Sequence, residues 1–370
     1  DLSDPISTLS GTEPSIKESE HYFFKLNELS GYLSSKVDEL SNQSPIKHKL
    51  KEWLDGELKD WDVSRDEPYF GFKVPGEENK YIYVWMDAPV GYLSSIKNWC
   101  DKNKYDYEKL LSDKDTKLVH FIGKDIVYFH LLFWPAMLHA ADIENIEEVF
   151  VHGFLTIEGM KMSKSRGNFI LADKALEYAN ADFYRYYLSS KLNTDISDIN
   201  FSVDDFVQKI NSDLIGKYIN IASRTQNFLT KHNNSEVKQN CQNETNKYKD
   251  LYAEIVSQTN DREYSKALKN IMSIADEANA YISSAEPWSK AKEGQIDACI
   301  EICSESLNLF KDLTILLNPF IPNITESLFE MLNLKQTDYD QISKDSLKEV
   351  RPFKAIITRL EKSEFEGILN

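Results

Sequence analysis

The sequence predicts an α/β region followed by an all-α region. Within 116–157, two apolar strand patterns flank a helical one, and strand, helix and strand in that order indicate a parallel α/β sheet. Beyond Asn168, apolar residues recur at helical spacing almost throughout, which indicates a bundle of helices. The chain has 370 residues, enough for two or three domains with cores of their own.

The elements of the first half are expected in a definite order. A short strand begins at His21, two helices cover about 26–42 and 46–58, and a loop follows over 61–75. The β-branched and aromatic run at 80–92 reads as a strand that ends at Asp87, Ala88 and Pro89. A second strand over 116–123 leads into a helix over 124–141 that Asp125 could cap, and a third strand covers 147–157.

The second half is expected to be helical to its end. Amphipathic helices are predicted over 173–192 and 204–232, with breaks at 283–291 and 318–323, a polar loop near 233–245, and further helices to Asn370. Cys299 and Cys303 lie one helical turn apart and are expected to be small core thiols. The four cysteines form no CxxC pair, so we expect no metal site within this chain and a reducing, cytoplasmic setting. No apolar run is long enough to span a bilayer.

The net charge of −17 argues against nucleic-acid binding unless basic residues gather on one face. The helix expected over 204–232 meets that condition, because its basic residues recur at intervals that keep them near one face. They are Lys209, Lys217, Arg224 and Lys231, with Asn220 beside them. Trp288, after a helix-breaking proline, could stack on an unpaired base. The alternatives are a solvated helix face and a buried tryptophan.

Polar and aromatic residues lie where the predicted strands end. In parallel sheets, ligands bind beyond the carboxyl ends of the strands. Those ends fall at 85–92, at 123–125 and at His152 and Gly153, and an aromatic cluster on the following helix could hold a thioether. The segment EGMKMSKSRGN, residues 158–168, collects cations and small residues in one loop, as a phosphate-binding loop would; a solvated surface loop is the alternative.

These motifs together resemble the methionyl-tRNA synthetases, a family of class I aminoacyl-tRNA synthetases. KMSKS at 161–165 marks the class, and YVWMDAPVGY, FIGKDIVYFH, FWPAM, FVHGF and KMSKSRGN, in that order, match this member. WDVSRDEPYFGF and NSDLIGKYINIASR match it too, so the resemblance runs from about His21 to near the carboxyl end. It implies ATP-dependent activation of L-methionine and transfer to the 3′ end of tRNA(Met), for translation initiation and elongation.

The resemblance also implies site residues. The catalytic ones are Lys164, Lys161 and Arg65, and Gly167 lets the loop bend. The nucleotide would meet Lys164, Gly123, Asp125, His152 and Gly153. The methionine pocket would be lined by Trp85, Ala88, Pro89, Tyr92, Ile126, Phe129 and His130. The anticodon would be read by Asn220, Arg224 and Trp288. ATP and Mg²⁺ are the implied cofactors, and tRNA binds through its anticodon and acceptor end.

The implied domains are four: the end of a connective insertion (1–75), the second half of a Rossmann-type catalytic domain (76–155), the KMSKS loop with a stem-contact region (156–204), and an α-helical anticodon-binding domain (205–370). The HIGH-type histidine motif and the zinc-bearing knuckle of the family do not occur in the sequence. We therefore expect the chain to be the carboxy-terminal portion of a longer protein, inactive alone, with any Zn²⁺ in the missing segment.

Two alternatives are weighed against this function. One is a non-catalytic tRNA-binding module, which gives no physical reason for keeping both KMSKS and the aromatic pocket. The other is a synthetase for another apolar amino acid, against which the pocket aromatics argue less strongly. The sequence leaves monomer or homodimer open.

Overall fold

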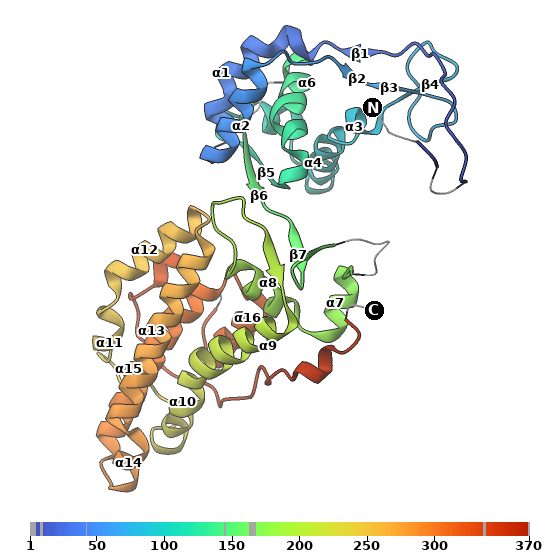
Figure 1. The fold of residues 1–370 in the computed structure, drawn as a ribbon. Coiled ribbons are helices and arrows are strands. Elements are labelled where there is room, and N and C mark those ends of the chain that lie inside the picture. The colour runs from blue at the N-terminus through green and yellow to red at the C-terminus, as the bar shows by residue number, and fades with distance from the viewer. Residues whose placement is uncertain are drawn as a thin grey trace. The chain divides into compact units, whose positions relative to one another are not determined.

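The computed structural model describes residues 5–7, 10–41, 43–143, 146–162, 168–335 and 338–368. The chain divides into two compact units, Asp1–Val151 and His152–Asn370 (Figure 1). This division is coarser than the four domains expected above, which stay a prediction. Within the described part of the chain, no helix is long and apolar enough to cross a membrane.

The first unit combines helices with three pairs of short strands. The strands are β1 (Phe23–Phe24), β2 (Trp61–Asp62), β3 (Ser64–Asp66), β4 (Lys80–Ile82), β5 (Lys117–Gly123) and β6 (Ile146–His152). The helices are α1 (Ser30–Leu40), α2 (Ser44–Asp55), α3 (Val84–Asp87), α4 (Val90–Asn103), α5 (Tyr107–Ser112) and α6 (Trp134–Ala140). Strand β1 pairs antiparallel with β2 and β3 antiparallel with β4, while β5 pairs with β6 across the crossover that contains α6. The strand at His21, the first two helices and β5 are confirmed.

Two expectations for the first unit were wrong in detail. The segment 61–75, expected to be a loop, begins with β2 and β3, because Trp61 and Ser64 have partner strands far along the chain. The strand expected over 80–92 stops at Ile82 and pairs with β3. Val84–Asp87 turns into helix instead, and Pro89, with φ −71°, fits the start of the helix that follows.

The helix after β5 starts differently from the prediction. Asp125 lies inside a 3₁₀ turn (Lys124–Ile126) whose N-cap is Gly123, and no side chain caps it. A π-helical turn (Phe129–Phe133) then leads into α6. The third strand predicted over 147–157 is two strands: β6 ends at His152, and β7 (Leu155–Ile157) belongs to a different sheet in the second unit.

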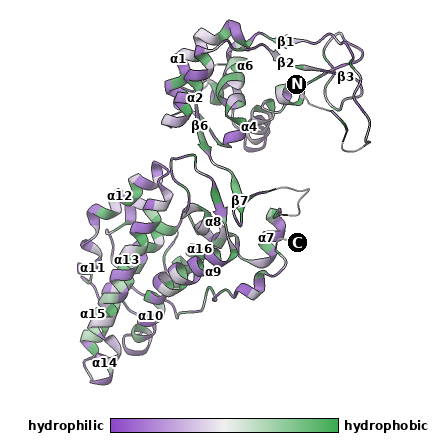
Figure 2. Ribbon diagram, in the orientation of Figure 1, coloured by the Kyte–Doolittle hydropathy of each residue, from purple (hydrophilic) through white to green (hydrophobic). Residues whose placement is uncertain are grey.

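The second unit combines a small sheet with a helical bundle. Strand β7 pairs antiparallel with β8 (Met160–Lys161) and parallel with β9 (Ile199–Phe201). The helices are α7 (Ala172–Tyr178), α8 (Ala181–Ser189), α9 (Val203–Lys209), α10 (Asn220–His232), α11 (Asn243–Asn246), α12 (Lys249–Asn260), α13 (Tyr264–Ala285), α14 (Pro287–Lys292), α15 (Ile296–Leu317) and α16 (Pro322–Met331). A π-helical segment (Ile210–Ile219) joins α9 to α10, and the helices carry both hydrophobic and hydrophilic residues (Figure 2). The predicted breaks fall between α13 and α14 and between α15 and α16.

Helix α15 is the centre of the bundle. Every residue from Cys303 to Leu317 is buried, so this part of the helix is enclosed on all sides rather than amphipathic. Cys299 and Cys303 are both fully buried, which confirms the expected core thiols, and burial raises the pKa of each.

The end of the chain is not helical, contrary to expectation. After Met331, the only helical elements among the described residues are two 3₁₀ turns, Tyr339–Gln341 and Lys362–Phe365. Side-chain amides hold this tail to the bundle: Gln226 accepts from Phe353 N at 2.9 Å and donates to Arg351 O at 2.6 Å. Asn211 bonds the backbone of Leu360 in the same two-point way, at 2.9 and 2.8 Å. These side-chain amides bond backbone N–H and C=O groups that would bond to one another if the tail were a helix.

Candidate amino-acid and RNA sites

A tyrosine–histidine pair is central to the aromatic cluster of the first unit. The hydroxyl of Tyr92, on α4, lies 2.8 Å from Nε2 of His130, on the π-helical turn. The other ring nitrogen of His130 lies 3.1 Å from the carbonyl oxygen of Ile126. A carbonyl only accepts, so Nδ1 carries the proton in neutral His130 and Nε2 accepts from Tyr92. The surrounding backbone therefore fixes both the tautomer and the direction of the bond.

Aromatic rings continue the cluster on both sides. Trp85 lies 5.0 Å from Phe129, and Tyr92 lies 6.2 Å from Trp134, between ring centroids. Phe129 and His130 are buried, whereas Trp85 and Tyr92 are 36% and 37% exposed. One part of the cluster is therefore buried and another part is accessible to solvent. The remaining predicted lining residues differ in exposure. Pro89 is buried, Ile126 is half-buried against Phe129, and Ala88 is exposed.

One member of this cluster was not predicted. His120, on β5, is buried, and its ring lies 5.0 Å from Tyr92 and 5.6 Å from His130. The available signal was its place in β5, where Ile122 is also buried while Val119 and Phe121 are exposed. The cluster thus combines apolar rings with a few oriented polar groups, as pockets for small apolar ligands do.

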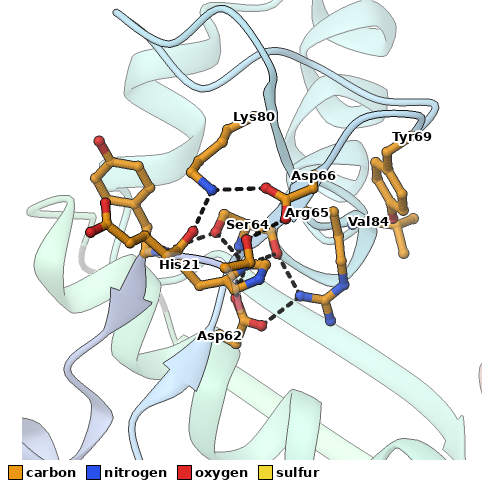
Figure 3. Close-up of polar contacts among 11 residues, drawn as sticks. His21, Asp62, Ser64, Arg65, Asp66, Tyr69, Lys80 and Val84 are labelled. Atoms are coloured by element: carbon orange, nitrogen blue, oxygen red, sulfur yellow. Dashed lines mark hydrogen bonds and ion pairs between the residues drawn. The ribbon is translucent and has the colours of Figure 1, made fainter. Parts of the chain in front are cut away.

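Arg65 belongs to a polar cluster near the amino end of the first unit (Figure 3). Its Nη1 donates to Asp62 at 2.9 Å and to the carbonyl of Ser64 at 2.6 Å, and the guanidinium lies 3.6 Å from the centroid of Tyr83. The guanidinium is therefore held on β3 in one orientation. Beside it, Ser64 is buried and lies 3.1 Å from Nδ1 of His21.

An ion pair completes the Arg65 cluster. Lys80 donates to Asp66 at 2.8 Å and also to the carbonyl of Glu20 (Figure 3). These contacts clamp the chain at 19–22 against β3 and β4. The hydrogen bonds from Lys80 and Ser19 lower the pKa of Asp66 from its ordinary 3.8 to about 2.

The residues predicted to meet a nucleotide are divided between the units. Gly123 ends β5, and the exposed Asp125 follows it in the first unit. In the second unit, His152 is exposed and Gly153 is buried. A Cβ on Gly153 would lie 2.1 Å from the carbonyl oxygen of Ser197, so this glycine is required by a close backbone approach alone.

The strand that leads into the KMSKS motif is well defined. Strand β8 follows a tight turn in which Glu158 and Gly159 both have positive φ, and Nζ of Lys161 lies 4.7 Å from the ring centroid of Phe154. Lys161 is exposed. Lys164 and Gly167 lie outside the described residues, as do all of 163–167.

The three residues predicted to read an anticodon come together in the second unit. Asn220 and Arg224 lie one turn apart on α10, and the guanidinium of Arg224 lies 4.9 Å from the centroid of Trp288. Trp288 is 38% exposed, so one part of the ring is open to a stacking partner. The positive charge of the basic residues near one face of 204–232 is partly neutralised by acidic side chains. Lys209 pairs with Asp213 at 2.9 Å, and Lys217 pairs with Asp276 at 2.7 Å.

Potential metal ligands do not cluster in the described part of the chain. It contains no group of three or more His, Cys, Asp or Glu side chains placed to hold an ion. Mg²⁺ is usually bound by one or two carboxylates together with substrate phosphates and water. The described side chains therefore offer no ready-made metal cage.

Comparison with known proteins gives the family. Residues 1–226 match the family described as tRNA synthetases class I (M), and residues 233–360 match the anticodon binding domain of methionyl tRNA ligase. Among solved structures, Mycobacterium tuberculosis methionyl-tRNA synthetase in complex with methionyl-adenylate is similar, with a TM-score of 0.81 and 24% identity over 96% of this chain and 72% of that one. The apo form of the same enzyme gives a TM-score of 0.77 and 22% identity over 96% and 72%.

These matches confirm the predicted fold class, a Rossmann-type α/β region with a helical anticodon-binding region. The first match alone covers more than half of the chain, and the second covers most of the remainder. The chain therefore belongs to the class I tRNA synthetases (M), the family of the methionyl-tRNA synthetases.

Proposed function

We propose that the protein is a methionine–tRNA ligase in which the aromatic cluster recognises methionine and the group formed by Asn220, Arg224 and Trp288 recognises tRNA. Methionine is activated by ATP: its carboxylate attacks the α-phosphate, giving methionyl-adenylate and pyrophosphate. The methionyl group then passes to the ribose of the terminal adenosine of tRNA(Met). Neither step needs a covalent bond to the protein, so positioning and charge stabilisation supply the catalysis.

The observation that carries the amino-acid assignment is the aromatic cluster around Tyr92 and His130. A thioether makes favourable contacts with ring edges, and the rings of Trp85, Tyr92 and Phe129 lie within one cluster. The Tyr92 hydroxyl is held by His130 at 2.8 Å, so it is placed for an oriented contact rather than free to rotate. Pro89, Ala88 and Ile126 are proposed to complete the lining. Similarity to a structure with bound methionyl-adenylate supports the same assignment.

For the nucleotide, we assign the phosphates to the KMSKS loop and to the ends of two strands. Lys164 is the donor proposed to stabilise the charge that develops on pyrophosphate, an effect worth roughly 2.7–4 kcal/mol for one such group. Lys161, Gly123, Asp125, His152 and Gly153 are proposed contacts of ATP. Mg²⁺ would accompany ATP, held mainly by the phosphates. Arg65 is proposed to act in the activation step.

For tRNA, the proposed anticodon site is the group formed by Asn220, Arg224 and Trp288. Splayed single-stranded bases are read by stacking on aromatic or guanidinium planes together with hydrogen bonds to their edges. The cation–π pair of Arg224 and Trp288 offers the planes, and Asn220 offers the edge contact. Four buried free cysteines are in keeping with the reducing cytoplasm.

The test is ATP–pyrophosphate exchange with each of the twenty amino acids, on the natural full-length protein. We expect exchange with methionine only, and a loss of about 100-fold or more in Lys164→Ala. Exchange with another amino acid would refute the assignment of the pocket and leave the class intact. Binding of tRNA without any exchange would instead indicate a non-catalytic tRNA-binding module.

A further inference from the structure

Three polar pairs join the helix that carries the anticodon residues to α13. The pairs are Lys217–Asp276 at 2.7 Å, Asn220–Asn279 at 2.9 Å and Arg224–Ser283 at 3.0 Å. In every pair the two residues are 59 positions apart, so the two helices run in the same direction with matched register. The Asn220–Asn279 pair is the important one for recognition. Both side chains are amides, and the orientation of an amide decides whether it presents a hydrogen-bond donor or an acceptor.

The amide of Asn279 has its orientation fixed by two backbone groups. Its Nδ2 donates to the carbonyl oxygen of Lys217 at 2.8 Å and to that of Ala275 at 2.8 Å. Carbonyl oxygens only accept, so the nitrogen must face them and the oxygen must face the other way. That oxygen accepts from Nδ2 of Asn220 at 2.9 Å.

The orientation of the Asn279 amide also fixes the orientation of the Asn220 amide. Because Nδ2 of Asn220 donates to Asn279, Oδ1 of Asn220 is its free acceptor, and this oxygen makes no hydrogen bond within the described residues. Asn220 is half-buried beside the Arg224–Trp288 pair. An incoming base edge would therefore meet an oxygen first, next to two planes on which the base can stack.

We propose that Asn279 is a positioning residue that holds the amide of Asn220 with its oxygen toward the RNA, so that the site selects a base with an exocyclic amino group. This inference rests on the proposed function. Cytosine N4 and adenine N6 are donors that Oδ1 can bind, whereas uracil O4 and the O6 of hypoxanthine would set oxygen against oxygen. Without Asn279, the amide of Asn220 can turn by half a rotation and present its nitrogen to the wrong base. Selection would then be lost even though Asn220 is intact.

The test compares bases in the charging reaction of the full-length protein. Transcripts of tRNA(Met) carry the anticodons CAU, UAU or CIU, in which U and inosine each replace an amino group by a carbonyl. We expect the wild-type protein to prefer CAU in kcat/KM over at least one of the other two. In Asn279→Ala, that preference falls about 2-fold to 13-fold, the factor that one hydrogen bond of ordinary strength supplies.

Two further variants separate positioning from simple support of the fold. Asn279→Ser keeps a hydroxyl for the Ala275 carbonyl but releases Asn220, and it should lose the same preference if Asn279→Ala folds poorly. Adding Asn220→Asp to either variant should restore the preference, because a carboxylate presents an oxygen in both orientations. Asn270→Ala is the matched control: Asn270 is also half-buried on α13, with one amide bond of 3.1 Å to Gln258, and its loss should leave the preference unchanged.

The inference is overturned if Asn279→Ala and Asn279→Ser keep the wild-type preference, or if the wild-type protein charges the three transcripts equally. In both cases the protein still charges tRNA with methionine, so the proposed function stands. A wild-type protein that activates no amino acid refutes the proposed function, and this inference with it.

Discussion

The hydroxyl of Tyr92 donates to Nε2 of His130 at 2.8 Å, which joins α4 to the turn after β5. Because Nδ1 of His130 donates to the Ile126 carbonyl at 3.1 Å, Nε2 of the neutral ring acts as the acceptor. Removing either partner removes this hydrogen bond. The pair therefore behaves as one unit in any substitution experiment.

The first prediction concerns this pair. Tyr92→Phe and His130→Ala should each raise KM for methionine in pyrophosphate exchange, because each removes the same hydrogen bond. The double variant should be less impaired than the sum of the two, with a coupling of about 0.5–1.5 kcal/mol. Strict additivity would show that the two side chains act independently.

Gly153 is predicted to be irreplaceable for packing reasons. In Gly153→Ala, the new Cβ meets the carbonyl oxygen of Ser197 at 2.1 Å and the amide nitrogen of Asp198 at 2.7 Å, so backbone must move. We expect a loss of about 1–3 kcal/mol or more in unfolding free energy, measured by urea denaturation.

Gly31 provides the matched control for Gly153. It lies in α1 with nothing within 4 Å of an added Cβ. Gly31→Ala should therefore be neutral or stabilise the protein by up to about 1 kcal/mol. Equal stability of the two variants would contradict the close approach at Ser197.

The Asp66–Lys80 ion pair predicts a pH dependence in acid. A carboxylate with a lowered pKa stabilises the folded state above its ordinary pKa of 3.8, and this contribution is lost as pH falls through about 2. Wild-type protein should therefore lose stability relative to Asp66→Asn between about pH 5 and about pH 2, followed by acid unfolding. A constant difference between the two proteins over this range would show that the carboxylate is not shifted.

Trp288 is predicted to contribute a stacking plane to tRNA binding. Trp288→Ala should raise KM for tRNA about 5-fold to 150-fold, since stacking on one base is worth about 1–3 kcal/mol. Trp99→Ala is the control, because Trp99 is also exposed but lies on α4 of the first unit. Similar effects of the two substitutions would refute an assignment to the anticodon site.

The helical half could be predicted because its information is local. Apolar spacing and the prolines at 287 and 322 set the helices and their ends, whatever lies across the bundle. The short strands and the tail could not be predicted in this way. Trp61 and Ser64 form strands only with partners elsewhere in the chain, and Gln226 bonds backbone more than a hundred residues later.

In the candidate sites, too, the residues with a local sequence signal could be predicted and those that depend on distant partners could not. The motifs identified Tyr92, His130 and Trp288, and the structure brings each beside a predicted partner, although their roles stay predictions. His120 and Asn279 were missed because their local sequence does not show which residues of other elements they meet, although His120 lies on the buried side of β5. Their importance arises from neighbours on other elements, namely Tyr92 and Asn220.

The tail that follows α16 has a consequence for how the second unit comes apart. Asn308 and Asp312, on α15, accept from the backbone N–H groups of Leu347 and Ser343 at 2.8 and 3.1 Å, and Lys311 donates to the backbone carbonyl of Asp345 at 2.5 Å. Peeling the tail away would remove these bonds and leave the buried polar groups with fewer partners: Asn308 would keep Cys241, and Lys311 and Asp312 would keep each other. A protease that cuts in the 338–368 segment should therefore lower the stability of the bundle, and the amide hydrogens of α15 should exchange faster after the cut.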